Sequence, residues 1–342
     1  MPRPAEKRSP RALAMVFRPW FFVACLLVSE SGLADGGVFG DETRWSFSFL
    51  LGAHVAETED LNKGLYKSPF IGDAVILIRE GGSGTGVDGE DVDQNETAEQ
   101  PFRFDNPLPD EKAATLAGFE FAWHPNDRHA FFFGINSWER TATNEVTGNL
   151  PLQQYFINNI VNGKRTGTLS FTEYQLGWRY SFLRKPKYRV YSSLSIHEVF
   201  DLDYQERWVF LFADSPIEDL VGVRRDVFME SQTASLFMGG FGIGGEWFIR
   251  DWLSLGFEGK YMLSEREFSL RDIRERNDFI SGDQVTRSGM PFRRMSDGRL
   301  GYLVEDASTD DVDDPDTRED FYRSIRLNLD GWRLLFRVNL YY

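Results

Sequence analysis

The chain has 342 residues, is 42% hydrophobic and carries a formal net charge of −15. This acidity argues against a nucleic-acid partner, because phosphate binding needs a basic surface. The only cysteine is Cys25, in the N-terminal leader described below, so disulfides and thiolate metal sites are excluded for the rest of the chain. The aromatic share of 15% is high and fits either aromatic girdles at a membrane interface or a very aromatic soluble core.

Residues 1–34 have the pattern of a secretory signal peptide. They hold five Lys or Arg against two acidic residues, and an apolar run extends from Trp20 to Val28. Gly32 and Ala34 stand at the −3 and −1 positions of a cleavage site before Asp35. A lipoprotein leader acylated at Cys25 is the alternative, which the continuing apolar run disfavours. We therefore expect cleavage after residue 34 and a mature domain of residues 35–342.

Alternation of apolar and polar residues recurs along the mature chain and predicts about eight strands. They are expected over residues 44–54, 114–123, 129–140, 168–182, 188–204, 233–249, 252–265 and from about 322 to 342. The last is the clearest, because every second residue is apolar or aromatic while Arg333, Arg337 and Asn339 share the other face. The apolar row consists of Trp332, Leu334, Phe336, Val338, Leu340 and Tyr342.

The connections between these strands alternate in length. Tight turns are expected at 124–128, 184–187 and 250–251, and long loops near 57–112, 141–164, 208–230 and 271–320. Short periplasmic turns and long extracellular loops are typical of outer-membrane barrels. Two further short segments, Ala74–Ile78 and Gly301–Val304, could pair with each other, so ten strands remain an alternative to eight.

The chain resembles the small bacterial outer-membrane β-barrels of the OmpA, OmpX and OmpW type. The resemblance rests on the leader, the strand alternation, the asymmetry of loop lengths and the terminal aromatic row. The resemblance covers the whole mature chain, with Tyr342 standing where these barrels usually end in Phe. It implies an all-β fold, a transmembrane antiparallel up-and-down barrel in the outer membrane of a Gram-negative bacterium. It also implies contact with outer-membrane lipid and lipopolysaccharide, and a C-terminal sorting signal read by the barrel-assembly machinery. The last strand taken alone would also fit a soluble β-sandwich.

The polar faces of the predicted strands carry both acids and bases. An eight-stranded barrel is only wide enough for side chains to fill it, and an unpaired charge there is costly. We therefore expect a lumen network of ion pairs, with Glu258, Arg337 and Glu120 close together; a narrow gated conduit is the alternative. The predicted network comprises Glu120, Glu173, Arg179, Arg189, Glu246, Glu258, Lys260, Arg333 and Arg337.

Some side chains invite an enzymatic or metal-binding interpretation. Ser195 and His197 share the inner face of one predicted strand, while Glu198 faces outward and His54 lies on another strand. A Ser/His pair with an acid can transfer acyl groups, but no known lipid-hydrolase motif accompanies these residues, so we predict no catalytic residues. The acidic runs 88–96 and 310–320 could attract calcium but do not match a calcium-binding loop, so no metal or cofactor is predicted.

Three functions remain open from the sequence. The leading hypothesis is a non-enzymatic barrel whose loops mediate surface interaction or envelope integrity, with any extracellular ligand unidentified. The second is a porin-like narrow channel for small solutes. The third is a lipid-modifying outer-membrane enzyme.

Overall fold

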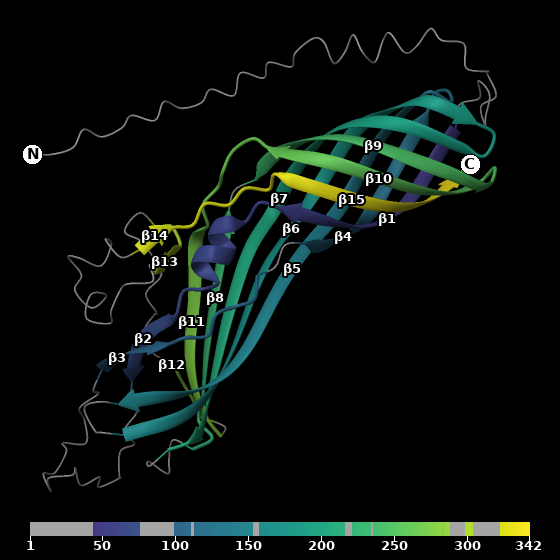
Figure 1. Cartoon of the computed structure of the whole chain (residues 1–342). Helices are drawn as coiled ribbons and strands as arrows, with labels where there is room; N and C mark the ends of the chain where they lie inside the picture. Colours follow the sequence, from purple (N-terminus) through teal and green to yellow (C-terminus); the bar gives the residue numbers. More distant parts are fainter. Residues whose placement is uncertain are drawn as a thin grey trace, which may run out of the picture.

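Eight antiparallel strands form a ring in the computed structural model (Figure 1). The structure describes residues 44–75, 99–110, 113–152, 157–215, 221–233, 235–282, 284–287, 298–303 and 322–342. The ring runs β7-β6-β5-β4-β1-β15-β10-β9, and β9 pairs in turn with β7. Its strands are β1 (Arg44–Ala56), β4 (Ala114–His124), β5 (His129–Leu152), β6 (Ile157–Lys185), β7 (Tyr188–Asp214), β9 (Leu236–Arg250), β10 (Leu253–Ser264) and β15 (Gly331–Tyr341).

Each of the eight strands predicted from alternation overlaps one of these ring strands. The predicted start of the last one near residue 322 is wrong, because its ring strand β15 begins at Gly331 and Tyr322–Ser324 lies outside the ring. The two segments left open form separate hairpins, because β2 (Phe70–Val75) pairs with β3 (Glu99–Phe104) and β13 (Gly301–Leu303) pairs with β14 (Tyr322–Ser324). The ring therefore has eight strands. The predicted leader and both acidic runs lie outside the described residues.

The apolar rows of the ring strands point outward. In the sheet, Phe49 of β1 lies opposite Val338 of β15 on one side and Phe119 of β4 on the other. Among the outward residues, Leu176 is 65% exposed and Ile196 is 64% exposed. The outer surface of the ring of strands is thus a continuous apolar and aromatic band. Neighbouring aromatic side chains touch within it; for example, the centroids of the Phe49 and Phe119 side-chain rings are 5.6 Å apart.

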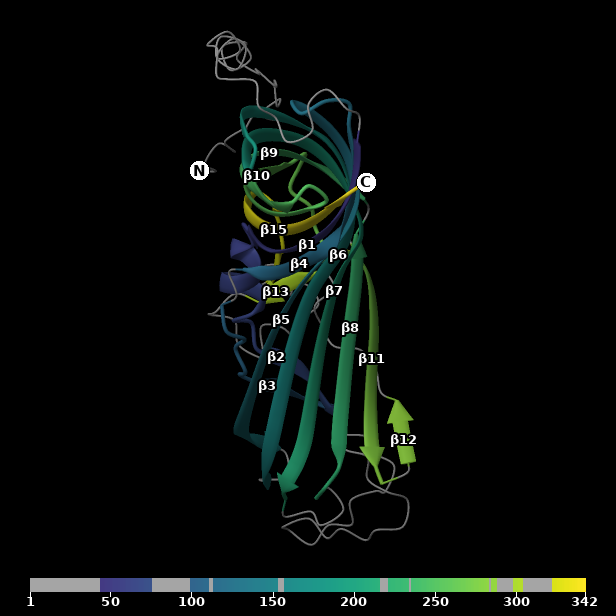
Figure 2. The same cartoon turned by 90° about the vertical axis from the view of Figure 1, so that its right-hand side faces the viewer.

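Three ring strands continue far beyond the ring and gain new partners there (Figures 1 and 2). Strands β8 (Arg224–Thr233), β11 (Arg271–Ser281) and β12 (Gln284–Arg287) join them in the order β5-β6-β7-β8-β11-β12. We call this six-stranded sheet the extension; it comprises residues 140–152, 157–170, 202–214, 224–233, 271–281 and 284–287.

The extension corrects the expectation of long loops. Much of 141–164 and 208–230, and the start of 271–320, is strand rather than loop. The reason lies in the inner face, where small residues such as Gly148 and Gly163 replace large apolar ones and weaken the alternation. The ring of Phe104 fills the space instead: a Cβ atom at Gly163 would lie 2.4 Å from Phe104 Cε1.

A bulge in β7 marks the boundary between ring and extension. The strand pairs with β9 up to Val199 and with β8 from Leu202 onward. Opposite Phe171, its register with β6 shifts by one extra residue, and Asp201 adopts a left-handed φ of 51°. The bulge changes which residues of β7 face outward, from even to odd numbers.

Short elements cover the inner face of the extension (Figure 1). They are the helix η2 (Asp60–Leu65) and the hairpins β2–β3 and β13–β14. Their apolar side chains pack with the sheet in a buried cluster that includes Leu61, Leu65, Leu108, Leu169 and Tyr204. No helix within the described residues is long and apolar enough to cross a membrane.

Candidate functional site

The inner faces of the ring strands carry a dense set of buried polar and charged side chains. Because strand alternation sends the apolar rows outward, every charged residue of the opposite face must point into the ring. All nine charged residues that the sequence places in the lumen are buried. They gather in three layers along the ring axis, each built around one or two carboxylates.

The layer at the short-turn end is centred on Glu246 of β9. Its carboxylate accepts from Arg189 Nε at 2.6 Å and from Asn339 Nδ2 at 2.8 Å. The hydroxyls of Ser254 and Tyr341 donate to the same carboxylate, and Arg189 donates to Tyr341. One carboxylate therefore joins four strands, β7, β9, β10 and β15.

The middle layer holds two carboxylates and three cations. Glu258 of β10 pairs with Arg337 and lies 3.3 Å from Lys260 Nζ. Glu120 of β4 accepts from Arg179 Nη2 at 2.5 Å, and Arg337 Nε stands 4.0 Å from the same carboxylate. The predicted proximity of Glu258, Arg337 and Glu120 is thus present in the structure.

The third layer is centred on Glu173 of β6, across the lumen from β15. Arg333 binds its carboxylate with two nitrogens, Nη1 at 2.5 Å and Nη2 at 3.0 Å. Asn136 Nδ2 donates to the same carboxylate at 2.8 Å. His54 Nδ1 lies 3.3 Å from Arg333, which links this layer to β1.

A serine, a histidine and an acid stand in line within this third layer. His197 Nε2 is 2.8 Å from Ser195 Oγ, and His197 Nδ1 is 3.1 Å from Glu173. The acid is therefore Glu173 from the neighbouring strand, not Glu198, which faces outward. Glu173 is also held by Arg333, and both His197 and Glu173 are fully buried, so this arrangement is part of the polar packing of the lumen.

A second buried charged site lies in the extension, where the sequence predicted loops. Arg165 of β6 is fully buried and donates to Glu206 of β7 at 2.9 Å. The same guanidinium donates to the backbone carbonyls of Leu65, Tyr66, Ser68 and Asn106. Its Cζ also lies 4.4 Å from the Trp208 ring centroid. Arg165 thus attaches the covering segments to the sheet, and no feature of the sequence pattern signals this role.

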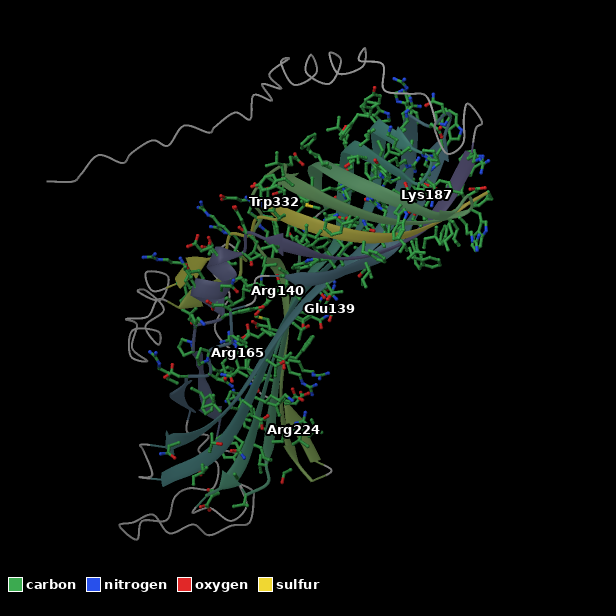
Figure 3. The ribbon with its side chains drawn as sticks, turned by 45° about the vertical axis from the view of Figure 1, so that its right-hand side comes forward. Glu139, Arg140, Arg165, Lys187, Arg224 and Trp332 are labelled. Carbon is green, nitrogen blue, oxygen red and sulfur yellow. The ribbon has the colours of Figure 1, made fainter. Side chains whose placement is uncertain are left out.

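The predicted terminal row of β15 lies on the outer face of the ring. Trp332, Leu334 and Phe336 are exposed there, and Tyr342 follows the end of the strand. Figure 3 shows Trp332 at the extension end of the ring, Lys187 at the short-turn end, and Arg165 and Arg224 out on the extension.

Comparisons with known proteins leave the family open. No family model matches the chain, and no curated protein matches it. Among solved structures, the outer membrane protein OprG from Pseudomonas aeruginosa aligns over 89% of this chain and 97% of its own, with 7% identity and a TM-score of 0.32. The toluene transporter TbuX from Ralstonia pickettii aligns over 92% of both chains, with 10% identity and a TM-score of 0.17. Likenesses this distant carry no argument about function.

Proposed function

We propose that this chain is a non-enzymatic outer-membrane β-barrel protein, with a lumen filled by ion pairs and an extension that meets partners at the cell surface. The observation that carries the proposal is the polarity of the ring. Its outer residues are apolar and exposed, while its inner residues are charged and buried. A water-soluble barrel would bury the apolar rows, whereas a lipid-facing barrel needs them outside.

Energetics support the placement in lipid. An exposed apolar patch on a soluble monomer rarely exceeds a few hundred Å², and a band around eight strands is far larger. In a bilayer core every backbone polar group needs a partner within the protein, which a ring of paired strands supplies. The eight strands of the ring pair with their neighbours, including β7 with β9, and this pairing supports the proposed placement.

The proposed orientation places the short turns in the periplasm and the extension outside the cell. The turns between β4 and β5, β6 and β7, and β9 and β10 lie together at one end of the ring, where β1 begins and β15 ends. Short turns are typical of the periplasmic side. In this orientation β15 presents its outward aromatic row as the sorting signal for the barrel-assembly machinery.

The proposed lumen is occupied rather than open. Guanidinium and carboxylate groups from different strands meet at hydrogen-bond distance in each of the three layers, and the Arg333–Glu173 pair spans the ring from β15 to β6. The interior of an eight-stranded barrel has room for little more than such side chains. A structural role of the ring, with recognition carried by the extension, fits this filling better than transport or lipid modification.

Site-directed spin labelling tests the placement in the membrane. Leu176→Cys carries the label on the outer face of the ring, and Thr143→Cys carries it on an exposed outer position of the extension. In lipid vesicles we expect the label at residue 176 to be accessible to dissolved oxygen and shielded from a water-soluble nickel chelate. The label at residue 143 is the matched control and should show the reverse.

Two outcomes of that experiment would overturn the proposal. Equal access of the nickel chelate to both labels would mean that the outer face of the ring meets water. Failure of the mature chain to show a heat-modifiable gel shift after refolding in vesicles would argue against an embedded barrel as well. Either result would favour a soluble β-fold.

A further inference from the structure

A groove of about 780 Å³ crosses the outer face of the extension. It lies over β6, β7, β8 and β11, on the side away from the covering elements. The residues lining it are Lys164, Thr166, Thr168, Gln205, Arg207, Val209, Arg224, Phe228 and Arg276.

The groove concentrates positive charge on a strongly acidic chain. Four of its lining residues are cationic, and the described lining includes no acid. The nearest acids lie beneath: Asp226 accepts from Arg207 Nε at 2.9 Å and from Arg224 Nη2 at 2.8 Å, and Asp278 lies 2.9 Å from Arg276 Nε. The lining residues themselves therefore carry four positive charges, of which three are on guanidinium groups paired with these two largely covered carboxylates.

Further acids stand at the rim of the groove. Glu230 of β8 lies opposite Arg274 of β11 in the register, Glu145 of β5 lies opposite Lys164, and Asp203 of β7 accepts a hydrogen bond from Gln205 at 2.7 Å. Two of these acids, Glu230 and Glu145, are each beside a basic residue. The centre remains occupied by guanidinium groups.

The centre of the groove combines charge with an aromatic ring and neutral hydrogen-bonding groups. The registers place Thr166, Arg207, Phe228 and Arg276 in one row across four strands. Guanidinium groups suit phosphate because their donors form a planar fork, and an aromatic ring packs against the apolar face of a sugar. Threonine hydroxyls and the amide oxygen of Gln205, whose Nε2 donates to Asp203, supply hydrogen-bonding groups for sugar hydroxyls.

The groove is continuous with the surface that we propose faces lipid. Along β6, even-numbered residues point outward without interruption from Leu176 through Tyr174 to Thr166. The bulge at Asp201 adjusts β7, so that Arg207 points to the same side as Ile196 of the ring. Thr166 lies roughly 25 Å along the strand from Tyr174, at about 3.3 Å per residue, and strand tilt reduces the height.

From this position and chemistry we propose that the groove binds the phosphorylated core saccharide of lipopolysaccharide in the surrounding outer leaflet. The inference rests on the proposed membrane placement, because only an embedded ring brings this face over lipid headgroups. Phosphates occupy the guanidinium groups, and a sugar ring rests on Phe228. The extension is thereby anchored to the leaflet beside it.

Binding of purified lipopolysaccharide to the folded full mature chain in detergent tests this assignment. The variant Lys164→Gln/Arg276→Gln removes two groove cations and keeps the Asp226 pairs intact. We expect about tenfold weaker binding of lipopolysaccharide with a phosphorylated core, and a similar loss when the wild-type protein meets enzymatically dephosphorylated lipopolysaccharide. The matched control is Lys187→Gln, an exposed lysine at the short-turn end, which should bind as the wild type does.

Other outcomes would overturn the inference. Equal binding by the groove variant and the control, or equal binding of the two forms of lipopolysaccharide, would exclude the groove as the site. Competition by inorganic phosphate at the affinity of the glycolipid would indicate a simple anion site. A heat-modifiable gel shift verifies folding of each variant, and Lys164→Glu provides a second test if the double variant fails to fold. If spin labels show an embedded ring while the groove variant binds lipopolysaccharide as the wild type does, this inference is wrong and the proposed function stands.

Discussion

At the residue scale, the strongest constraint in the extension is the burial of Arg165. Its guanidinium is the shared donor for one carboxylate and four backbone carbonyls from a separate part of the chain. A buried charge with that many partners is stabilising only while all of them remain in place. Removing the guanidinium would leave Glu206 buried and its carbonyl partners without this donor.

We therefore predict that Arg165→Met loosens the covering segments and leaves the ring intact. The expected loss is about 3–5 kcal/mol in the stability of the extension, the range for breaking a buried pair. Proteolysis should become faster within residues 57–112 while the heat-modifiable shift is kept. The neighbouring outward variant Lys164→Gln is the control, and Arg165→Met/Glu206→Gln should recover part of the loss. Unchanged proteolysis of Arg165→Met would contradict this role.

The ion pairs of Asp226 predict a pH dependence on the outer face. Burial acts to raise the pKa of its carboxyl, but hydrogen bonds and charges from Arg207 and Arg224 outweigh burial and lower the pKa below its usual value. A lowered pKa stabilises the folded state above the unfolded value of about 3.9 and loses that contribution as pH falls through the folded value. The stability difference between wild type and Asp226→Asn, measured by denaturant unfolding, should shrink below about pH 4. A difference that stays constant from pH 7 to pH 3 would refute the assignment.

At the element scale, the β7 bulge connects two sheets that share one strand. A left-handed φ is unfavourable for residues with a Cβ, least so for Asp and Asn, and glycine adopts it freely. We predict that Asp201→Gly is at least as stable as the wild type and that Asp201→Val loses about 1–2 kcal/mol. Thr168→Val, at a regular strand position of the extension, is the control for a β-branched substitution. Equal unfolding midpoints for Asp201→Gly and Asp201→Val would show that the bulge is not strained.

The same scale shows why the sequence predicts the ring strands and misses the extension. Ring strands have outward-facing, exposed residues as large as Trp332 and Phe336, so their alternation is strong. In the extension neither face is uniformly apolar or polar, since Arg165 and Gly163 face inward while Lys164 and Thr166 face outward. Strand character there depends on partners far away in the chain, which a local pattern does not contain.

Some of the lumen contacts can be predicted from the sequence and others cannot. Alternation predicts which charged residues share the inner face. Counting residues along the strands from the short-turn end also places Glu258 and Arg337 at similar heights in the ring. It does not predict that Arg333 reaches Glu173, because these residues come from strands 160 positions apart and on different sides of the ring. Nor does it identify Glu173 as the acid beside His197, since the pairing depends on the register between β6 and β7, which places Gln175 opposite His197.

At the scale of the whole molecule, the filled lumen predicts that the barrel does not conduct. Arg333 of β15 and Glu173 of β6 bridge the ring near the extension. In its middle Arg179 Nε of β6 lies 3.8 Å from Glu258 of β10, and near the short turns Arg189 of β7 reaches Tyr341 of β15. An ion crossing the barrel would have to displace all three layers, and breaking each buried pair costs several kcal/mol. In planar bilayers we expect no steady single-channel steps from protein whose heat-modifiable shift verifies insertion, while a porin in the same bilayer serves as the positive control. Steady, ohmic steps from the wild-type chain would instead require a continuous water path past these layers, and would replace the structural role proposed for the ring with that of a narrow channel.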